Sequence, residues 1–202
     1  VQIRLSQTFS FSCMNTYPSP FCQCSEDLSY KINDRNRGQA EPYFSYLKCA
    51  KCGTLRITEI PENLSSFYPP QYYKIPSLKE VEAKTQQNTF KISLVSKYLR
   101  GGNFLEVGPA FGIFALQAKK HGFQVSAIEM DGQCCDFLNN IANIPTAHSA
   151  DPERAMRNMP LQNGIALWHV IEHLPNPWAL IDIAATKLDP GGYLFIATPN
   201  PE

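Results

Sequence analysis

The chain has 202 residues, of which 44% are hydrophobic and 18% charged, and its 18 basic and 18 acidic side chains balance. This balance gives no electrostatic reason to expect a nucleic-acid partner, because phosphates are held by an excess of Lys and Arg. No stretch reaches the roughly 18 apolar residues that span a bilayer, and the first residues lack the pattern of a secretory signal. We therefore expect a cytoplasmic protein, without a membrane partner, that holds one α/β domain and a small module.

Five of the seven cysteines fall within the first 52 residues, and clustering of this kind favours a bound metal over disulfides. Cys22 and Cys24 form one pair, and Cys49 and Cys52 form a second pair that is followed by a glycine. Four thiolates suit a structural, tetrahedral Zn²⁺, so we expect zinc bound by these four residues. Because the first pair is tighter than the usual C-x-x-C, Cys13 is a reserve ligand. Unliganded cysteines in an irregular module are the alternative.

The first part of the chain, residues 1–76, is rich in Ser, Pro, Tyr and Cys and shows no sustained helical period. This profile is typical of a small, loop-rich unit that needs a metal to stay folded, here a zinc-ribbon-like module. Ser77 and Glu80 then form a capping-box pattern. Residues 77–102 are predicted to be a helical linker, with a break near Asn88 and its end at Arg100, before a pair of glycines.

From residue 103 onward the pattern alternates short apolar strands with helices. The expected strands cover residues 104–107, 123–129, 144–149, 164–168 and 193–198. The expected helices cover residues 113–120, 133–141, a stretch that begins after Asp151, and 177–188. Residues 103–202 are therefore predicted to form a doubly wound, mostly parallel sheet with helices on both faces.

A glycine-rich turn, residues 108–112, follows the first of these strands. Open α/β sheets bind ligands at the carboxyl ends of their strands, and small residues let the backbone pass close to a ligand. Free amides at the start of the next helix add a site for polar groups. Glu129 ends the second strand, where its two oxygens can accept both ribose hydroxyls of a nucleoside. A structural turn with an unrelated acid is the alternative.

The same turn can be compared with the dinucleotide-binding fingerprint, which needs three spaced glycines. This chain has Gly108, Ala110 and Ile113 at those places. Ala110 would push back a pyrophosphate, and Ile113 would crowd the contact between helix and strand. An adenosyl amino acid has no pyrophosphate and tolerates alanine, so the turn favours that ligand.

Several segments together resemble the motifs of class I S-adenosylmethionine-dependent methyltransferases. They are Leu105 to Gly112, Ala127 to Glu129, Leu167 to Pro177, Leu188 to Tyr193 and Thr198 to Asn200. The resemblance covers residues 103–202 and implies a Rossmann-like methyltransferase fold. That fold normally continues with a helix and an antiparallel hairpin, so we expect the hairpin to be missing from the given residues. The cysteine pattern resembles a zinc-binding segment found ahead of some bacterial sugar and small-molecule methyltransferases.

The resemblance also implies which residues hold S-adenosylmethionine. They are Glu106, Gly108, Ala110, Gly112, Glu129, Asp151, Trp168 and His169. Glu129 would hold the ribose, Asp151 would edge the adenine, and Trp168 and His169 would pack beside the methionine portion. Glu106 stands where the family usually has Asp, and keeps the charge.

His169, Glu172 and His173 follow the fourth strand and are the catalytic candidates. An enzyme that transfers a methyl group must hold the acceptor at near-attack distance, and a hydroxyl or carbon acceptor also loses a proton. Histidine is a suitable base near neutral pH. The alternative is structural: Glu172 and His173 orient the loop, and His169 packs against the cofactor. Some quinone O-methyltransferases that this segment resembles place a catalytic metal near an equivalent Glu–His pair.

Three functions remain open from the sequence. The first is methyl transfer to a small-molecule acceptor such as a nucleotide-linked sugar or another metabolite. The second is an RNA methyltransferase whose zinc module grips RNA, which the neutral charge disfavours. The third is a non-catalytic, zinc-containing adaptor, which would not need to bind S-adenosylmethionine.

Overall fold

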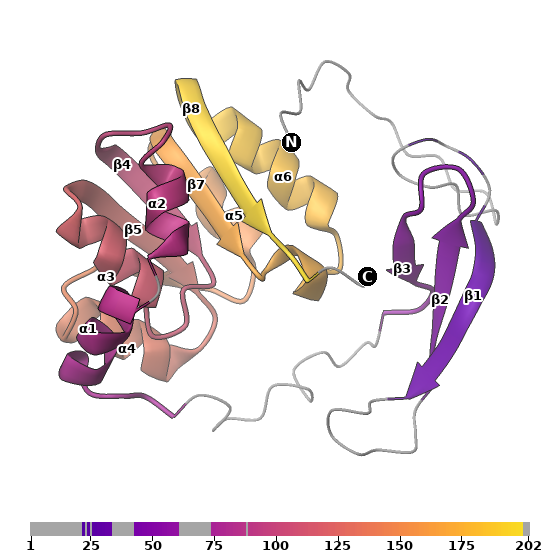
Figure 1. Ribbon diagram of the computed structural model, residues 1–202, viewed down its shortest axis with the longest axis horizontal. Helices are drawn as coiled ribbons and strands as arrows, with labels where there is room; N and C mark the ends of the chain where they lie inside the picture. The colour runs from indigo at the N-terminus through magenta and orange to yellow at the C-terminus, as the bar shows by residue number, and fades with distance from the viewer. Residues whose placement is uncertain are drawn as a thin grey trace. The chain divides into compact units, whose positions relative to one another are not determined.

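The computed structural model describes residues 22, 24, 26–33, 43–60, 74–87 and 89–199. Its contacts divide the chain into two compact units, Val1–Phe67 and Tyr68–Glu202. The first unit contains a three-stranded sheet and the second a five-stranded sheet (Figure 1). Across these described ranges, no helix has the length and apolar character needed to cross a membrane.

The sheet of the first unit is antiparallel, with the strands in chain order. Its strands are β1 (Glu26–Asn33), β2 (Tyr43–Cys49) and β3 (Leu55–Ile57). A tight turn joins β2 to β3: the Gly53 amide donates to the Cys49 carbonyl at 2.9 Å, and the Cys49 amide donates to the Thr54 carbonyl at 2.9 Å. Gly53 has a φ of 75°, a left-handed conformation that glycine adopts without steric cost. The turn therefore fixes both ends of the C-x-x-C segment.

The five strands of the second unit lie in the order β6-β5-β4-β7-β8, and every neighbouring pair is parallel. The strands are β4 (Gly102–Val107), β5 (Phe123–Glu129), β6 (Thr146–His148), β7 (Gln162–Trp168) and β8 (Leu188–Ala197). The predicted doubly wound parallel sheet is confirmed. The strand order reverses between β4 and β7, and this is where open α/β sheets bind ligands.

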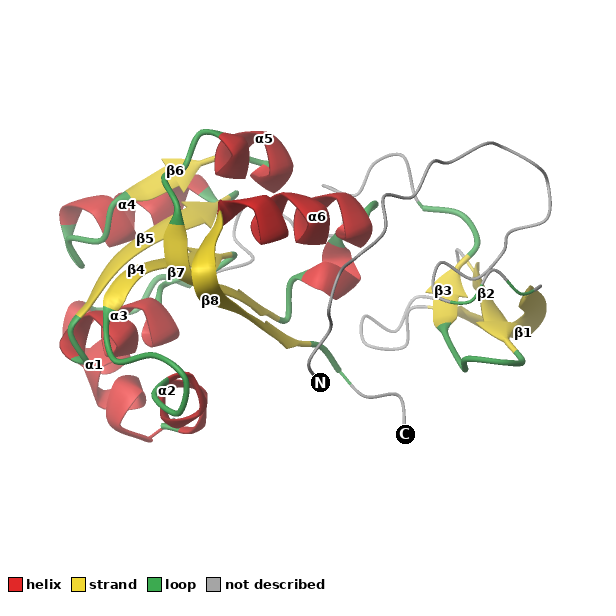
Figure 2. Ribbon diagram, turned by 90° about the horizontal axis from the view of Figure 1, so that it is seen from above, coloured by secondary structure: helices red, strands yellow, loops and turns green. Residues whose placement is uncertain are grey.

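Helices cover both faces of this sheet. They are α1 (Leu78–Gln87), α2 (Phe90–Val95), α3 (Ile113–Lys120), α4 (Gly132–Asn140), α5 (Pro152–Arg157) and α6 (Pro177–Lys187). One apolar cluster joins the sheet to α1, α2, α3 and α4, and a second joins its other face to α5 and α6. Figure 2 shows α5 and α6 on one side of the strands and α1, α2 and α3 on the other.

Two predicted helix starts are confirmed by their hydrogen bonds. The Ser77 amide and hydroxyl donate to one Glu80 oxygen at 2.7 and 2.8 Å, and the Glu80 amide donates back to the Ser77 hydroxyl at 3.4 Å. These bonds from Ser77 hold the pKa of Glu80 below its usual value. At α5, the Asp151 side chain accepts from the Arg154 amide at 2.9 Å, and Pro152 occupies the first turn.

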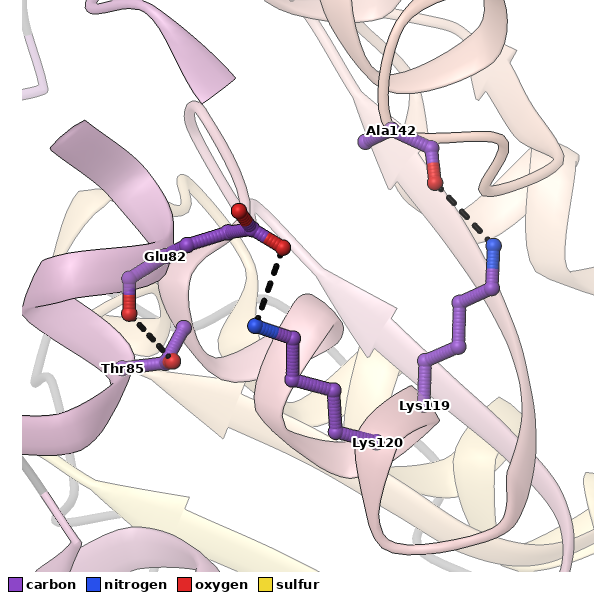
Figure 3. Close-up of polar contacts among 5 residues, drawn as sticks. All are labelled: Glu82, Thr85, Lys119, Lys120 and Ala142. Carbon is purple, nitrogen blue, oxygen red and sulfur yellow. Dashed lines mark hydrogen bonds and ion pairs between the residues drawn. The ribbon is translucent and has the colours of Figure 1, made fainter. Parts of the chain in front are cut away.

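Helix α1 is part of the core of the second unit, because a buried glutamine of α3 holds it. Gln117 donates from its side chain to the Thr85 carbonyl at 2.7 Å, and both residues are buried. Figure 3 shows Thr85 bonded to the Glu82 carbonyl and the Glu82 carboxylate paired with Lys120, at 2.7 and 3.1 Å. Residues predicted to form a helical linker thus pack directly on the sheet domain.

Most boundaries agree with the prediction to within two residues, and two differ by more. The second helix of the predicted linker ends at Val95 rather than Arg100, because the next amides bond in short turns, as from Tyr98 to the Val95 carbonyl at 3.0 Å. Strand β8 begins at Leu188 rather than Tyr193. Leu188 already pairs with Gln162. A shift of register in the β7–β8 pairing then accommodates the segment that contains Gly191 and Gly192.

Candidate cofactor site and cysteine cluster

The glycine turn after β4 lies at the reversal of strand order, against the segment that follows β7. Gly108, Ala110 and Gly112 have φ values of 65°, 52° and 78°, so the backbone turns through left-handed conformations. The Gly108 amide donates to the Ile128 carbonyl at 2.8 Å. A Cβ added to Gly108 would lie only 2.8 Å from a methyl carbon of Val170. Glycine is therefore required here by conformation and by space.

Glu129 at the end of β5 joins two loops at the carboxyl edge of the sheet. Its Oε2 accepts from the Ala110 amide at 2.8 Å, and its Oε1 accepts from the Met130 and Asp131 amides at 2.7 and 2.9 Å. The side chain is only 3% exposed. A carboxylate offers about four acceptor positions, so three amides leave one for a ligand hydroxyl. This organising role was not predicted, since it depends on a contact between two separate loops.

Glu106 in β4 is the second buried carboxylate of this edge and is also 3% exposed. Burial raises its pKa to about 8, against the opposing effects of the Lys91 charge and the Ala115 amide. Its Oε2 has no hydrogen-bond partner within the described residues. A buried polar atom without a partner is costly, and a ligand with a donor group would satisfy it.

Lys91 of α2 extends toward the same place, and no sequence pattern had singled it out. Its ammonium lies 5.3 Å from the ring centroid of Trp168, the last residue of β7. Burial lowers the Lys91 pKa, and the nearby Glu106 acts against that change. The Trp168 ring packs edge-on against Phe114 at 5.3 Å, and its Nε1 has no hydrogen-bond partner in the described part of the chain. The region thus gathers a cation, a carboxyl group and an unused N–H donor.

The three catalytic candidates lie in and before a short 3-10 helix, η2 (Ile171–His173). His169 has a φ of 58°, and its amide donates to the Ala197 carbonyl of β8 at 2.8 Å. Its side chain is 55% exposed, and its Nδ1 lies 3.5 Å from a Glu172 oxygen. The His173 amide donates to the Val170 carbonyl at 3.0 Å. The structure therefore places His169 and Glu172 together on an exposed edge.

Asp151 follows β6, beside the other strand ends. The Ser149 amide donates to the Glu129 carbonyl at 2.8 Å, which brings the two loops together. One Asp151 oxygen is already used as the cap of α5. Its predicted contact with the adenine would have to use the other oxygen.

In the first unit, three of the four predicted metal ligands lie together. The thiol sulfurs of Cys22, Cys49 and Cys52 are all within 4.8 Å of one another. Cys22 and Cys49 are 3.4 Å apart at their sulfurs, and the Cys52 amide donates to the Cys49 sulfur at 3.5 Å. Cys24 is not in this group, because its thiol donates to the Cys22 carbonyl at 3.5 Å. Cys13, the predicted reserve ligand, lies outside the described residues.

Comparison with known proteins agrees with this geometry. The methyltransferase domain family matches residues 83–202, which is more than half of the chain, and the chain belongs to this family. Ubiquinone biosynthesis O-methyltransferases from Shewanella halifaxensis and Xylella fastidiosa are 28% and 27% identical, over 50% and 56% of this chain. These matches cover 44% and 49% of the relatives, so the chain spans about half the length of the curated relatives it matches.

A solved structure of a SAM-dependent methyltransferase from Archaeoglobus fulgidus shares the fold. The TM-score is 0.51 at 20% sequence identity, and the match covers 58% of this chain and 54% of that one. At this identity the likeness concerns the fold alone. The family assignment rests on the match to residues 83–202, and both agree with the motifs after β4, β5 and β7.

Proposed function

We propose that the chain binds S-adenosylmethionine at the carboxyl ends of β4, β5 and β7 and transfers its methyl group to a small-molecule acceptor. The observation that carries the proposal is the position of Glu129. This buried carboxylate ties the glycine turn to the loop after β5 and keeps one acceptor position on Oε2. A ribose hydroxyl supplies the donor that this position needs.

The amino-acid end of the cofactor fits the polar groups around β4. Its ammonium would donate to the unpartnered Oε2 of Glu106, and its carboxylate would accept from Lys91 and from the Trp168 indole N–H. These pairings support S-adenosylmethionine over a nucleoside without an amino acid. The glycine-rich turn, residues 108–112, would bring the backbone close to the cofactor.

The chain's part in the reaction is mainly to position the acceptor. Holding the acceptor at near-attack distance can supply roughly 7–11 kcal/mol of the barrier. His169 is an exposed imidazole at this edge, and Glu172 lies close enough to its Nδ1 to orient the ring. We assign His169 as the base that receives a proton from a hydroxyl acceptor, with Glu172 positioning it.

The class of acceptor is the finer part of the proposal. The ubiquinone biosynthesis enzymes that the chain resembles act on a small molecule, which supports a hydroxylated metabolite as acceptor. A nucleotide-linked sugar fits the same requirement. RNA fits less well, because the chain has no net positive charge to neutralise phosphates. The cytoplasmic location expected from the composition stays a prediction.

The test is production of S-adenosylhomocysteine by the full chain with acceptors of three classes: phenols, nucleotide-linked sugars and RNA. We expect turnover with a small hydroxylated acceptor and none with RNA. Turnover with RNA alone would support the RNA-modifying alternative. Absence of both turnover and cofactor binding would support the adaptor.

We also propose that the cysteine cluster of the first unit binds Zn²⁺. Thiolates held at about 2.3 Å by a tetrahedral zinc are about 3.8 Å apart, which is close to the separations found here. The Cys52 amide donates to the Cys49 sulfur, a bond that a metal-bound thiolate at that position would keep. Zinc content measured on the full chain tests this: it should fall in Cys49→Ser and stay unchanged in Cys135→Ala, a buried cysteine of the second unit.

A further inference from the structure

The three grouped thiols of the cysteine cluster differ in burial. Cys49 is buried at the end of β2, Cys22 is half-buried and Cys52 is exposed on the turn to β3. Backbone bonds of the β2–β3 turn hold Cys49, and Cys52 bonds to the Cys49 sulfur through its amide and to the Thr54 hydroxyl through its thiol. Cys22 approaches Cys49 to 3.4 Å between sulfurs. These three sulfurs are therefore already grouped as a metal requires.

Cys24 is the obvious fourth ligand, and it is directed elsewhere. Its thiol contacts the carbonyl of Cys22 at 3.5 Å and does not lie within 4.8 Å of all three grouped sulfurs. One residue alone separates Cys22 from Cys24, whereas two separate Cys49 from Cys52. The shorter spacing leaves less backbone to fold both thiols around one ion.

We infer that Cys22, Cys49 and Cys52 form a three-thiolate zinc site, that Cys24 is not a ligand, and that the fourth position, which no other thiol of the described residues approaches, takes water or a small exogenous ligand. The inference rests on the zinc proposal above and specifies its coordination. The exposure of Cys52 supports it, because solvent reaches the cluster on that side. Zinc with three protein ligands and an open position can exchange its fourth ligand, whereas a closed structural site cannot.

The experiment replaces zinc by Co²⁺ in the full chain and measures the thiolate-to-cobalt charge-transfer absorption, which grows with the number of bound thiolates. Cys24→Ala should leave the absorption unchanged. Cys22→Ala, Cys49→Ala and Cys52→Ala should each remove about a third of it, or abolish binding. Added imidazole should shift the visible cobalt bands by taking the open position. Cys135→Ala is the control for a cysteine outside the cluster.

Two results would overturn the inference. One is a loss of about a quarter of the absorption in Cys24→Ala or Cys13→Ala, which identifies a fourth thiolate. The other is a cobalt spectrum that imidazole does not change. Failure of the unaltered chain to bind either Zn²⁺ or Co²⁺ contradicts the zinc proposal itself, together with the inference. Far-ultraviolet circular dichroism of each variant, compared with the unaltered chain, shows whether it is folded, so that metal loss is not confused with unfolding.

Discussion

Two buried carboxyl groups at the edge of the parallel sheet have opposite surroundings. Glu129 accepts three backbone N–H groups, whereas Oε2 of Glu106 has no partner within the described residues. Glu106 also faces Lys91 from α2, and the charge of Glu129 acts on it from β5. Glu129 therefore joins the loops of the site, and Oε2 of Glu106 can accept from a donor group of a ligand.

The raised pKa of Glu106 predicts a pH dependence of stability. The folded chain keeps this proton up to about pH 8, whereas the unfolded chain loses it near 4.5. Between these values the folded state binds more protons, so its stability falls as the pH rises. Glu106→Gln has no such proton, and its stability should vary less with pH over this range. Chemical denaturation of both proteins at several pH values measures the difference, and parallel curves would contradict the account.

Lys91→Met tests the contact with the cofactor's carboxylate. Loss of a charged hydrogen bond should lower the affinity for S-adenosylhomocysteine by about tenfold or more, because such bonds contribute about 1.5–3 kcal/mol. Methylthioadenosine lacks the amino acid and should bind both proteins about equally. Calorimetric titration with the two ligands separates the effects. Equal weakening of both would mean that Lys91 acts through the fold and not through this contact.

Some residues of the candidate sites could be predicted from the sequence and others could not, and the difference has a physical cause. Gly108 and Glu129 stand at the ends of apolar strands, and strand ends converge in a parallel sheet, so their closeness was predictable. Lys91 lies within a helix like any surface lysine, and only the packing of α2 brings it to Glu106. The separation of Cys24 from the other thiols likewise depends on backbone geometry that spacing alone does not specify.

At the scale of elements, the docking of α1 on α3 depends on one buried hydrogen bond, from Gln117 to the Thr85 carbonyl. Gln117→Ala removes this buried donor and its packing, so it should lower the free energy of unfolding by about 1–3 kcal/mol. Lys120→Ala removes only an exposed ion pair with Glu82 and should cost less than about 1 kcal/mol. Denaturant titration compares the two, and equal losses would contradict the assigned roles.

The alternation of strands and helices from β4 to β8 was predictable because each buried strand is a short apolar run bounded by turn residues. The strands of the first unit were not predicted, because β1, with the sequence EDLSYKIN, is largely polar and carries no such run. The early start of β8 was also missed. Its Asp-Pro-Gly-Gly segment has the composition of a turn, yet the strand pairing continues past it with an irregularity.

At the scale of the whole molecule, the two units have separate sheets and separate candidate sites. A zinc chelator should therefore unfold the cysteine-bearing unit and leave cofactor binding by the second unit largely unchanged. Zinc release with a chromogenic chelator, followed by titration with S-adenosylhomocysteine, tests this. Loss of cofactor binding in step with zinc release would show that the metal supports the cofactor site.

The most direct test of the central claim is calorimetric titration of the full chain with S-adenosylmethionine. We predict saturable binding with one cofactor per chain. Glu129→Ala should lower the affinity by about a hundredfold or more, because the acceptor for the ribose hydroxyl and the hydrogen bonds to three backbone amides are both lost. Asp136→Asn, an exposed acid on α4, should bind as the unaltered chain does. No binding by the unaltered chain, or equal affinity in Glu129→Ala, would contradict the proposed function.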